Sequence, residues 1–405
     1  MRWWRQAWPG LLATLDGVGL CRFAYTPLIP FMIASGLLTA TGAAYLGAAN
    51  LLGYLAGAAV AAPLATRIGL GLAIRASFCL SVLSLAVCVP DLGFSAYAVA
   101  RFVAGVTGAF LMVLAPSYLL AEIEPRERGR AGGVIYTGVG IGIAVSSLIV
   151  PLLADHRPSW AWAALALGAL ATTAATWSRW GQRRSVRRLP AGAGRLGLPV
   201  LLVMIAFGMD GIGFVPHMLF WVDYISRSLG LGVAAGALQW LLFGLGAAIG
   251  PSMGGMVGDA IGIGRALVLA FALKAAAVLV PTLWTGFPAL AFSSVIVGAL
   301  TPGIAAICAA RMTELVPPAG QMRAWGYATL CFGLFQAAGG YGMAFAFDML
   351  RSYVPLYVAG AGFEAIGAAA ALAALLWQRR RPIGATAGFS RENGVDGIIQ
   401  YKDDK

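Results

Sequence analysis

Charged side chains are scarce in this 405-residue chain, and their scarcity excludes most classes of soluble protein. Asp, Glu, Lys and Arg make up 11% of the residues, whereas 60% are hydrophobic and the mean hydropathy is +0.82. A soluble domain has about a quarter charged residues, so this composition is that of a membrane protein. The alternating pattern of a membrane β-barrel is absent too, because the apolar runs are long and continuous. Spanning helices are the remaining choice.

Paired cysteines and catalytic motifs are also missing. The sequence contains no Walker loop, nucleotide fingerprint, HExxH or nucleophile elbow. We therefore expect no enzyme and no cofactor, and any transport would draw on an ion gradient or on the gradient of the solute itself. The cysteines lie in apolar segments without CxxC spacing, so we expect neither disulfides nor a metal site. They are Cys21, Cys79, Cys88, Cys308 and Cys331.

Twelve apolar stretches each have roughly the 20 residues that a membrane span needs. They lie at about 8–34, 42–65, 71–90, 95–120, 131–154 and 160–177, and at 197–224, 232–257, 266–286, 288–313, 325–347 and 354–377. We therefore expect an all-α integral membrane protein with twelve transmembrane helices. Its parts would be a six-helix half at 1–177, a basic cytoplasmic linker at 178–196 and a second six-helix half at 197–378.

Arginine is concentrated on one side of these spans. The loops on the opposite side hold only Arg157, Arg227 and Arg351. Lys and Arg favour the cytoplasmic side, so we expect a multi-pass membrane protein with both termini in the cytoplasm. The same bias accounts for the net charge of +12 without a nucleic-acid partner, and the basic linker would contact anionic lipid. The tail at 379–405 turns abruptly polar; we expect it to be cytoplasmic, in part an appended tag, and outside the fold.

The two halves repeat each other. LDGVG at 15–19 and MDGIG at 209–213 differ only by exchanges of Leu for Met and Val for Ile, and proline follows each. Both stretches should therefore be broken helices. The pattern E-x-x-P, four or five residues, R-A-x-G occurs at 122–133 and again at 314–326. Because these landmarks share one offset, we expect two pseudo-symmetric six-helix bundles.

Several of these motifs resemble a known family. GDAIGIGR, with Asp259 and Arg265, resembles the G-x-x-x-D-[RK]-x-G-[RK] turn of the major facilitator superfamily, although the first half has Thr66 in place of the aspartate. Arg101 resembles the arginine of that family's fourth helix, and the stretch at 17–33 resembles the first helix of its YbfB/YjiJ-like bacterial branch. The resemblance implies the twelve-helix fold, a place in the bacterial inner membrane, alternating access, a monomer, and an Arg101 that lies beside the first helix. It implies structural or coupling roles for these three charges.

Ionisable side chains inside spans are costly and usually face a cavity or a partner. Asp16 and Asp210 occupy equivalent positions of the repeat. Each is a candidate for proton coupling, because a gated carboxylate can bind and release a proton; each could equally cap a helix or lock a gate. His217 follows Asp210 by seven residues, which places both on one face of a continuous helix, so it is a candidate proton relay or a neutral hydrogen-bond partner. Copper binding by His217 and nearby methionines lacks a repeated M-x-x-M spacing.

Arg22 lies near the middle of the first span and cannot lose its charge. It should therefore bind an anionic solute or pair with an intramembrane acid. Asp223 should pair with Arg227 one turn later. Lys274 in the ninth span should snorkel or pair, and because that span usually lies outside the cavity in the family, we expect a structural role for it. The further candidates for substrate contact offer rings and hydrogen-bonding groups. They are Tyr25, Tyr136, Gln239, Trp240 and Gln336.

These features favour a secondary active transporter of a small organic solute, anionic or zwitterionic, coupled to protons and working by alternating access. A proton-driven exporter of drugs or metabolites is the alternative within this class, although the fifth span, TGVGIGIAVSS, lacks the Gly-Pro typical of drug antiporters. A non-transporting sensor or scaffold on the same fold and a membrane enzyme are the alternatives outside it. Ligand-induced stabilisation without flux would favour the sensor.

Overall fold

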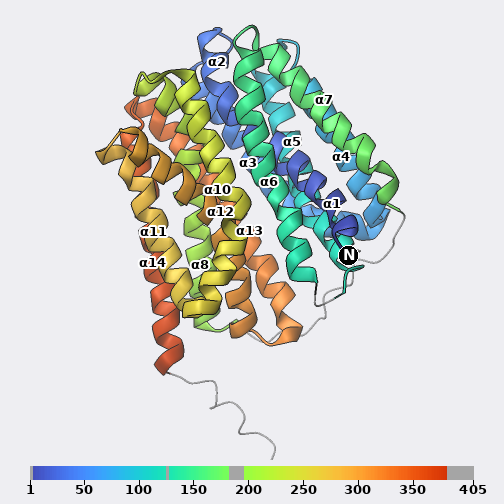
Figure 1. The fold of residues 1–405 in the computed structure, drawn as a ribbon, viewed down its shortest axis with the longest axis vertical. Helices are drawn as coiled ribbons and strands as arrows, with labels where there is room; N and C mark the ends of the chain where they lie inside the picture. Colours follow the sequence, from blue (N-terminus) through green and yellow to red (C-terminus); the bar gives the residue numbers. More distant parts are fainter. Residues whose placement is uncertain (1–2, 125–126, 182–195, 381–405) are drawn as a thin grey trace, which may run out of the picture.

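The computed structural model describes residues 3–124, 127–181 and 196–380, and over these ranges it consists of helices and short turns without any strand (Figure 1). The arginines of the predicted linker at 182–195 lie outside these ranges, as does the predicted tail from residue 381 onward. Their roles stay predictions.

The first half of the chain contains seven α-helices and three short segments of other helical types. They are α1 (Trp3–Thr14), η1 (Leu15–Leu20), η2 (Phe23–Leu28), α2 (Ile29–Ala34), α3 (Ala40–Ile68), α4 (Leu70–Ala86), α5 (Phe94–Leu120), α6 (Arg128–Ala154), α7 (Pro158–Thr176) and η3 (Trp177–Arg179).

The second half repeats this order. Its elements are α8 (Leu198–Gly213), η4 (Pro216–Phe220), α9 (Trp221–Asp223), η5 (Tyr224–Ser228), α10 (Gly232–Ile261), α11 (Ile263–Leu283), α12 (Phe287–Leu315), α13 (Pro318–Leu350) and α14 (Val354–Arg380).

Ten helical segments of the described chain are long and apolar enough to cross a membrane. The other two predicted spans are helical but weaker in this respect. Helix α4 is apolar but only 17 residues long, and the 19 residues of α7 include many alanines and threonines. A multi-pass helical membrane protein is therefore established, whereas the count of twelve spans and the symmetry of two bundles stay predictions.

Helices pack mainly within their own half of the chain. In the first half α3 packs on α5, α1 on α6 and α4 on α7; in the second, α10 packs on α12 and α14 lies against both α8 and α11. In Figure 1 the first group, blue to green, lies on the right, and the second, yellow to red, on the left. Helices α6 and α10 pack across the boundary between the halves, as do α3 and α13.

The first and seventh spans are interrupted in the middle, as their glycines and prolines predict. A π-helical turn at Leu15–Leu20 follows α1, and a 3-10 turn at Phe23–Leu28 follows that. In the seventh span α8 ends at Gly213, and two π-helical turns flank the short α9. Proline has no backbone N–H to continue a helix, and irregular backbone within a membrane is tolerated where protein or a cavity surrounds it. The prediction of two broken helices is confirmed.

Contacts between α3 and α13 lie toward the N-terminal end of α3. Thr41 donates a hydrogen bond to Asp348 at 2.9 Å, and the rings of Tyr45 and Tyr341 lie 6.2 Å apart. A methyl group added at Gly340 would come within 2.7 Å of the Leu51 side chain. The two halves are therefore in close contact at the end of the molecule where the turns before α3 and after α13 lie.

Helices α6 and α10 cross so closely that their backbones are in contact. A methyl group on Gly140 would lie 2.5 Å from the backbone nitrogen of Ala248 and 2.6 Å from the carbonyl oxygen of Gly244. Nearer the start of α6, methyl groups on Gly132 and Gly133 would meet no atom within 4 Å. The close contact therefore belongs to the middle of α6 and gives way to open space toward its N-terminal end.

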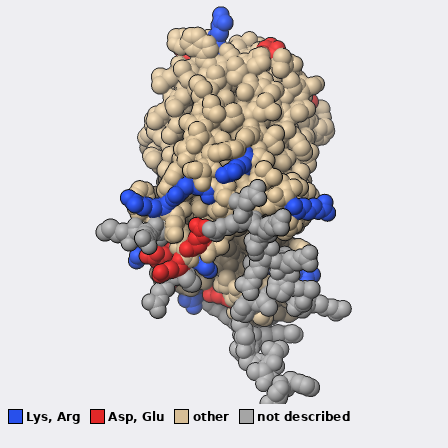
Figure 2. Space-filling model, turned by 90° about the vertical axis from the view of Figure 1, so that its right-hand side faces the viewer, with Lys and Arg blue, Asp and Glu red and all other residues tan. Residues whose placement is uncertain are grey.

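The distribution of charge supports a membrane setting. On the face shown in Figure 2 a broad belt carries no charged side chain, and Lys and Arg gather mainly toward one end. Many large hydrophobic side chains are exposed on the outer helices, such as Leu152 and Met256, each 72% exposed. Exposed apolar surface on this scale is costly in water and favourable in lipid.

Candidate functional site

Arg22 lies buried where the two halves meet, between the π-helical and 3-10 turns of the first span. Its Nη2 donates to the sulfur of Met218 at 3.2 Å, and its guanidinium lies 4.9 Å from the ring centre of Tyr54 and 5.3 Å from that of Phe23. Its Nε makes no hydrogen bond, and no carboxylate pairs with it in the described part of the chain. A thioether is a weak acceptor. Arg22 therefore keeps most of its capacity for binding an anion.

Arg101 fixes the backbone that carries Arg22. From α5 its two Nη atoms donate to the carbonyl oxygens of Cys21 at 2.6 Å and Arg22 at 3.3 Å. Asn50 adds a bond to the Cys21 carbonyl at 3.3 Å. These carbonyls have lost their helical partners at the break, and a guanidinium can satisfy two of them at once. The position of Arg101 beside the first span agrees with the one implied by the family resemblance.

A small cavity adjoins the two arginines. Its volume is about 10 Å³, close to the space that one water molecule requires. Its lining includes Arg22, Arg101, Thr26 and Met218, which come from both halves of the chain. Thr26 also donates to the Met218 carbonyl at 2.5 Å, so the broken segments of the first and seventh spans are bonded to each other. The described conformation is closed around Arg22 and leaves no room for an organic solute.

Aromatic side chains extend from this cavity into the second half. The ring of Phe23 lies 5.9 Å from that of Trp240 and 6.2 Å from that of Phe243, and the rings of Trp240 and Phe243 stack on each other at 4.7 Å.

Gln336 is buried, and neither end of its amide has a hydrogen-bond partner among the described residues. Buried, unpaired polar groups are rare in folded proteins, so Gln336 is available to a ligand.

The other three predicted substrate contacts differ in burial and in whether their polar groups already form hydrogen bonds. Tyr25 is buried, donates to the Ala43 carbonyl at 3.0 Å and lies under Arg101, so its hydroxyl is already used. Gln239 accepts from Ser294 at 2.9 Å. Tyr136 is half-buried on α6. Their contact with a solute stays a prediction.

A second cluster of ionisable groups lies within the second half. Lys274 of α11 is fully buried, with its Nζ 2.5 Å from Asp210 Oδ1 and 3.6 Å from Glu364 Oε1. Both acids are also fully buried, and the Lys274 ammonium lies 4.8 Å from the ring centre of Phe214. Three ionisable groups from α8, α11 and α14 therefore meet in surroundings without solvent. Lys274 is paired, as one of the predictions for it allowed.

Glu364 is absent from the residues that the sequence singled out. A usable signal exists, because it is an acid near the middle of the apolar stretch at 354–377, where an ionisable side chain is rare and functional by default. Its partnership with Lys274 could not be read from the sequence, since 90 residues separate them. Arg311 was missed in the same way; it bonds to Glu314 and Gln378 near the ends of α12 and α14.

Asp16 lies in a neutral environment. Its carboxyl oxygens accept from the Ser81 hydroxyl at 2.9 Å and from the Cys21 thiol at 3.9 Å. The hydroxyl of Thr172, in the sixth predicted span, donates to the Ala169 carbonyl at 2.8 Å. No Lys or Arg forms an ion pair with it among the residues that the structure describes. Asp16 and Asp210, which match in sequence, therefore differ in partners.

His217 points away from the boundary between the halves. Its Nε2 is 2.8 Å from the Ser293 hydroxyl, which donates to the Ala277 carbonyl, and its ring stacks on Trp221 at 4.4 Å. The helix that carries Asp210 ends at Gly213, so the assumption of one continuous face does not hold. A relay between Asp210 and His217 stays a prediction.

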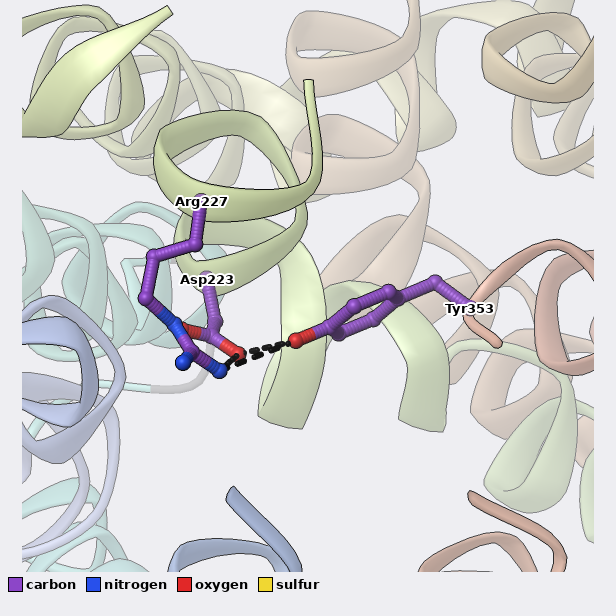
Figure 3. A network of polar contacts seen from close by, with 3 residues as sticks. All are labelled: Asp223, Arg227 and Tyr353. Carbon is purple, nitrogen blue, oxygen red and sulfur yellow. Dashed lines mark hydrogen bonds and ion pairs between the residues drawn. The ribbon is translucent and has the colours of Figure 1, made fainter. Parts of the chain in front are cut away.

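Asp223, Arg227 and Tyr353 form a third cluster near the turn between α13 and α14 (Figure 3). Arg227 Nε lies 2.5 Å from Asp223 Oδ1, which confirms the predicted pair, and Tyr353 donates a hydrogen bond to the same carboxylate. Burial, together with the negative charge of Asp223, raises the pKa of the Tyr353 hydroxyl. Because that hydroxyl keeps its proton, it holds α9 and η5 against the start of α14.

Asp259 and Arg265 lie on the surface at the turn between α10 and α11. Gly262 between them has φ +88°, a backbone conformation that favours glycine. The turn therefore has the local geometry that its glycines predict, and the gating or coupling role of the two charges stays a prediction.

The residues of both buried clusters lie within a region that matches a known protein family. A family model described as "Uncharacterised MFS-type transporter YbfB" matches residues 14–375, from the first span to the last. No curated protein matches the chain.

Proposed function

The chain belongs to this family of MFS-type transporters, and we propose that it moves a small organic anion across the bacterial inner membrane by alternating access, driven by protons. The buried, unpaired guanidinium of Arg22 carries the proposal. A desolvated positive charge is costly unless a partner compensates it. An anionic solute provides that partner whenever the cavity is large enough to admit it.

The position of Arg22 suits a transported solute. It lies at the boundary between the halves and near the middle of its span, where duplicated transporters bind their substrates. Its weak bond to Met218 sulfur is easily exchanged for a bond to a carboxylate, because charge-assisted bonds to carboxylates are among the strongest in proteins. Trp240, Phe23 and Gln336 would then contact the remainder of the solute.

The contacts between the halves indicate which side is closed. If both termini are cytoplasmic, the Thr41–Asp348 bond and the Tyr45–Tyr341 contact lie toward the outer side. Solute would then reach Arg22 from the cytoplasm after the cavity widens. A solute and protons moving together or in exchange are both compatible with this geometry, and the direction is set by the gradients.

The test uses purified protein in proteoliposomes, with a pH dye inside and a panel of labelled organic acids, amino acids and cationic drugs outside. We expect flux of one or more organic acids with accompanying proton movement. Arg22→Gln should abolish that flux, and Arg22→Lys should restore only part of it, since one ammonium replaces a two-pronged donor.

Arg75→Gln is the matched control. Arg75 also stacks on an aromatic ring, that of Trp177 at 5.1 Å, but it lies at the end of α4 away from the cavity. Full flux in Arg75→Gln and none in Arg22→Gln would support the proposal. Flux of cationic drugs that survives in Arg22→Gln would contradict it and favour the exporter.

A further inference from the structure

The cluster of Asp210, Lys274 and Glu364 has a counterpart in the first half at the same positions of the repeat. Each group of three comes from the equivalent spans: the first, third and sixth in one half, and the seventh, ninth and twelfth in the other. The pairs are Asp16 and Asp210, Ser81 and Lys274, and Thr172 and Glu364, which lie 194, 193 and 192 residues apart. The same position is thus neutral in one half and charged in the other.

The charged cluster has one more acid than base. Lys274 compensates a single carboxylate, and the shorter distance, 2.5 Å against 3.6 Å, assigns it to Asp210. A second carboxylate without a cation would be very costly at a site with no exposure to solvent. Electroneutrality therefore requires one additional proton.

The hydrogen bonds indicate where that proton resides. Within the described part of the chain, Asp210 Oδ2 and both carboxyl oxygens of Glu364 are buried without a hydrogen-bond donor, although the two carboxyl groups lie close enough to interact. Two ionised carboxylates can only accept hydrogen bonds, so they cannot satisfy each other. A proton on Glu364 supplies the missing donor and turns a repulsive contact into a bond.

Among the described residues, no hydrogen bond joins another titratable side chain to the Asp210, Lys274 and Glu364 cluster, although His217 Nδ1 is also buried without a partner. Cys308 of α12 and His217 of η4 lie within electrostatic range of Lys274, and Tyr357 of α14 packs edge-on against His217 at 5.2 Å. His217 is held by Ser293, and the Tyr357 hydroxyl lies 3.4 Å from the Pro216 carbonyl.

We propose that Asp210, Lys274 and Glu364 form a proton-binding site, that Glu364 carries the proton beside a fixed Lys274–Asp210 ion pair, and that this is the proton used in transport. The last part rests on the proposed function. At the equivalent position of the first half, the described residues place a single acid, Asp16, beside hydroxyl groups, with neither a Lys nor a second carboxyl group.

Contacts connect this site to the solute site. The Glu364 side chain packs on Gly213, where a methyl group would lie 2.6 Å from its carboxyl carbon, and Gly213 is the last residue of α8. The interrupted part of the seventh span follows and carries Met218, which bonds to Arg22. Loss of the proton puts an uncompensated charge against the end of α8, so it favours a conformation that admits water there and shifts the Met218 segment.

The first test needs no substrate. The full-length protein in liposomes is titrated in pH steps while infrared difference spectra record the C=O stretch of protonated carboxylic acids. The titrations use an Asp16→Asn background, because Asp16 is also buried without a Lys or Arg partner among the described residues and would give an acid band of its own. In this background we expect a band at neutral pH that is missing after Glu364→Gln and present after Thr172→Val, the matched substitution in the first half. The band should also vanish in Asp210→Asn, because Glu364 becomes the only carboxylate for Lys274 and ionises.

A Glu364→Gln spectrum identical to that of the wild type at every pH would overturn the assignment. If Glu364→Gln fails to fold, Asp210→Asn decides: a persistent acid band in that variant would also overturn it.

The second test addresses coupling, with the labelled organic acid that the wild type accumulates most strongly. We expect Glu364→Gln to keep exchange of label at equal pH on both sides but to lose accumulation driven by a pH gradient, while Thr172→Val keeps both. Accumulation that survives in Glu364→Gln, or is lost only in Asp16→Asn, would overturn the proposal. A wild type that moves no acid of the panel would count against the proposed function alone, because the infrared result does not depend on it.

Discussion

The two halves of the chain carry most of their buried charges at different positions of the sequence repeat. Where the first half has Arg101, which holds the carbonyls of a broken helix, the second has Ser294, 193 residues later, which bonds to Trp221 and Gln239. Where the second half has Lys274 and Glu364, the first has hydroxyl groups. The buried cluster of Arg22 and Arg101 and the buried cluster of Asp210, Lys274 and Glu364 are therefore not equivalent.

The difference indicates a division of labour after duplication. A cluster at the boundary between the halves can meet a solute, and its free charge is a guanidinium that cannot titrate. A cluster enclosed between α8, α11 and α14 meets only protons, and its excess group is a carboxyl that can titrate. In the proposed mechanism, the solute site and the proton site therefore lie at different positions of the same repeated scaffold.

Removal of the Lys274 charge is expected to have the largest effect. Lys274→Met leaves two buried acids without a cation, and breaking a buried pair from one side costs about 3–5 kcal/mol. The double variant Lys274→Met/Asp210→Asn removes both charges of the pair and should recover most of that loss. Thermal unfolding in detergent measures both. A Lys274→Met protein as stable as the wild type would show that the second half is as neutral as the first.

Arg101→Lys is expected to have an intermediate effect. One ammonium cannot reach the carbonyls of both Cys21 and Arg22, and the loss of a hydrogen bond to a charged group costs about 1.5–3 kcal/mol. Because the backbone of Arg22 loosens, solute affinity should also fall, measured as the half-saturating concentration in proteoliposomes. The pH dependence of accumulation should stay unchanged, the reverse of the result for Glu364→Gln. A shifted pH profile in Arg101→Lys would show that Arg101 also affects proton coupling, so that the solute site and the proton site could no longer be treated as separate.

The smallest effect is expected at the neutral cluster. Ser81→Ala removes one hydroxyl from Asp16, and a neutral hydrogen bond contributes about 0.5–1.5 kcal/mol. No charge changes, so the loss of thermal stability should be equal at acidic and alkaline pH. A loss as large as that of Lys274→Met, or one that varies with pH, would mean that Asp16 is ionised and that the two clusters are alike.

Patterns within the sequence predicted the helical membrane architecture and the two broken helices, because hydropathy and glycine or proline positions act locally. The breaks in the first and seventh spans follow from Gly17, Gly19 and Pro27 and from their counterparts. The Asp223–Arg227 pair followed from helical spacing alone. These features depend on neighbours in the chain, which the sequence displays directly.

Contacts between distant spans were harder to predict. Lys274 was interpreted as structural because its span was expected to lie outside the cavity, and its pairing with Asp210 depends on how α8, α11 and α14 meet. The expected shared face of Asp210 and His217 relied on a regular helix, and the break after Gly213 directs His217 to Ser293 instead. The identity of the solute is not encoded in any local pattern, because Arg22 specifies only the sign of its charge.

The crossing of α6 and α10 has a mechanical consequence. Gly140, Gly244 and Ala248 bring the two backbones into direct contact, and the Ile143 side chain of α6 packs on Gly244 of α10. In the proposed alternating-access motion, a contact surface of such small residues lets one half rotate on the other with few bulky side chains in the way. A single methyl group at Gly140 would overlap the backbone of α10. Substitution of this uncharged glycine should therefore block the proposed motion as effectively as the loss of a buried charge.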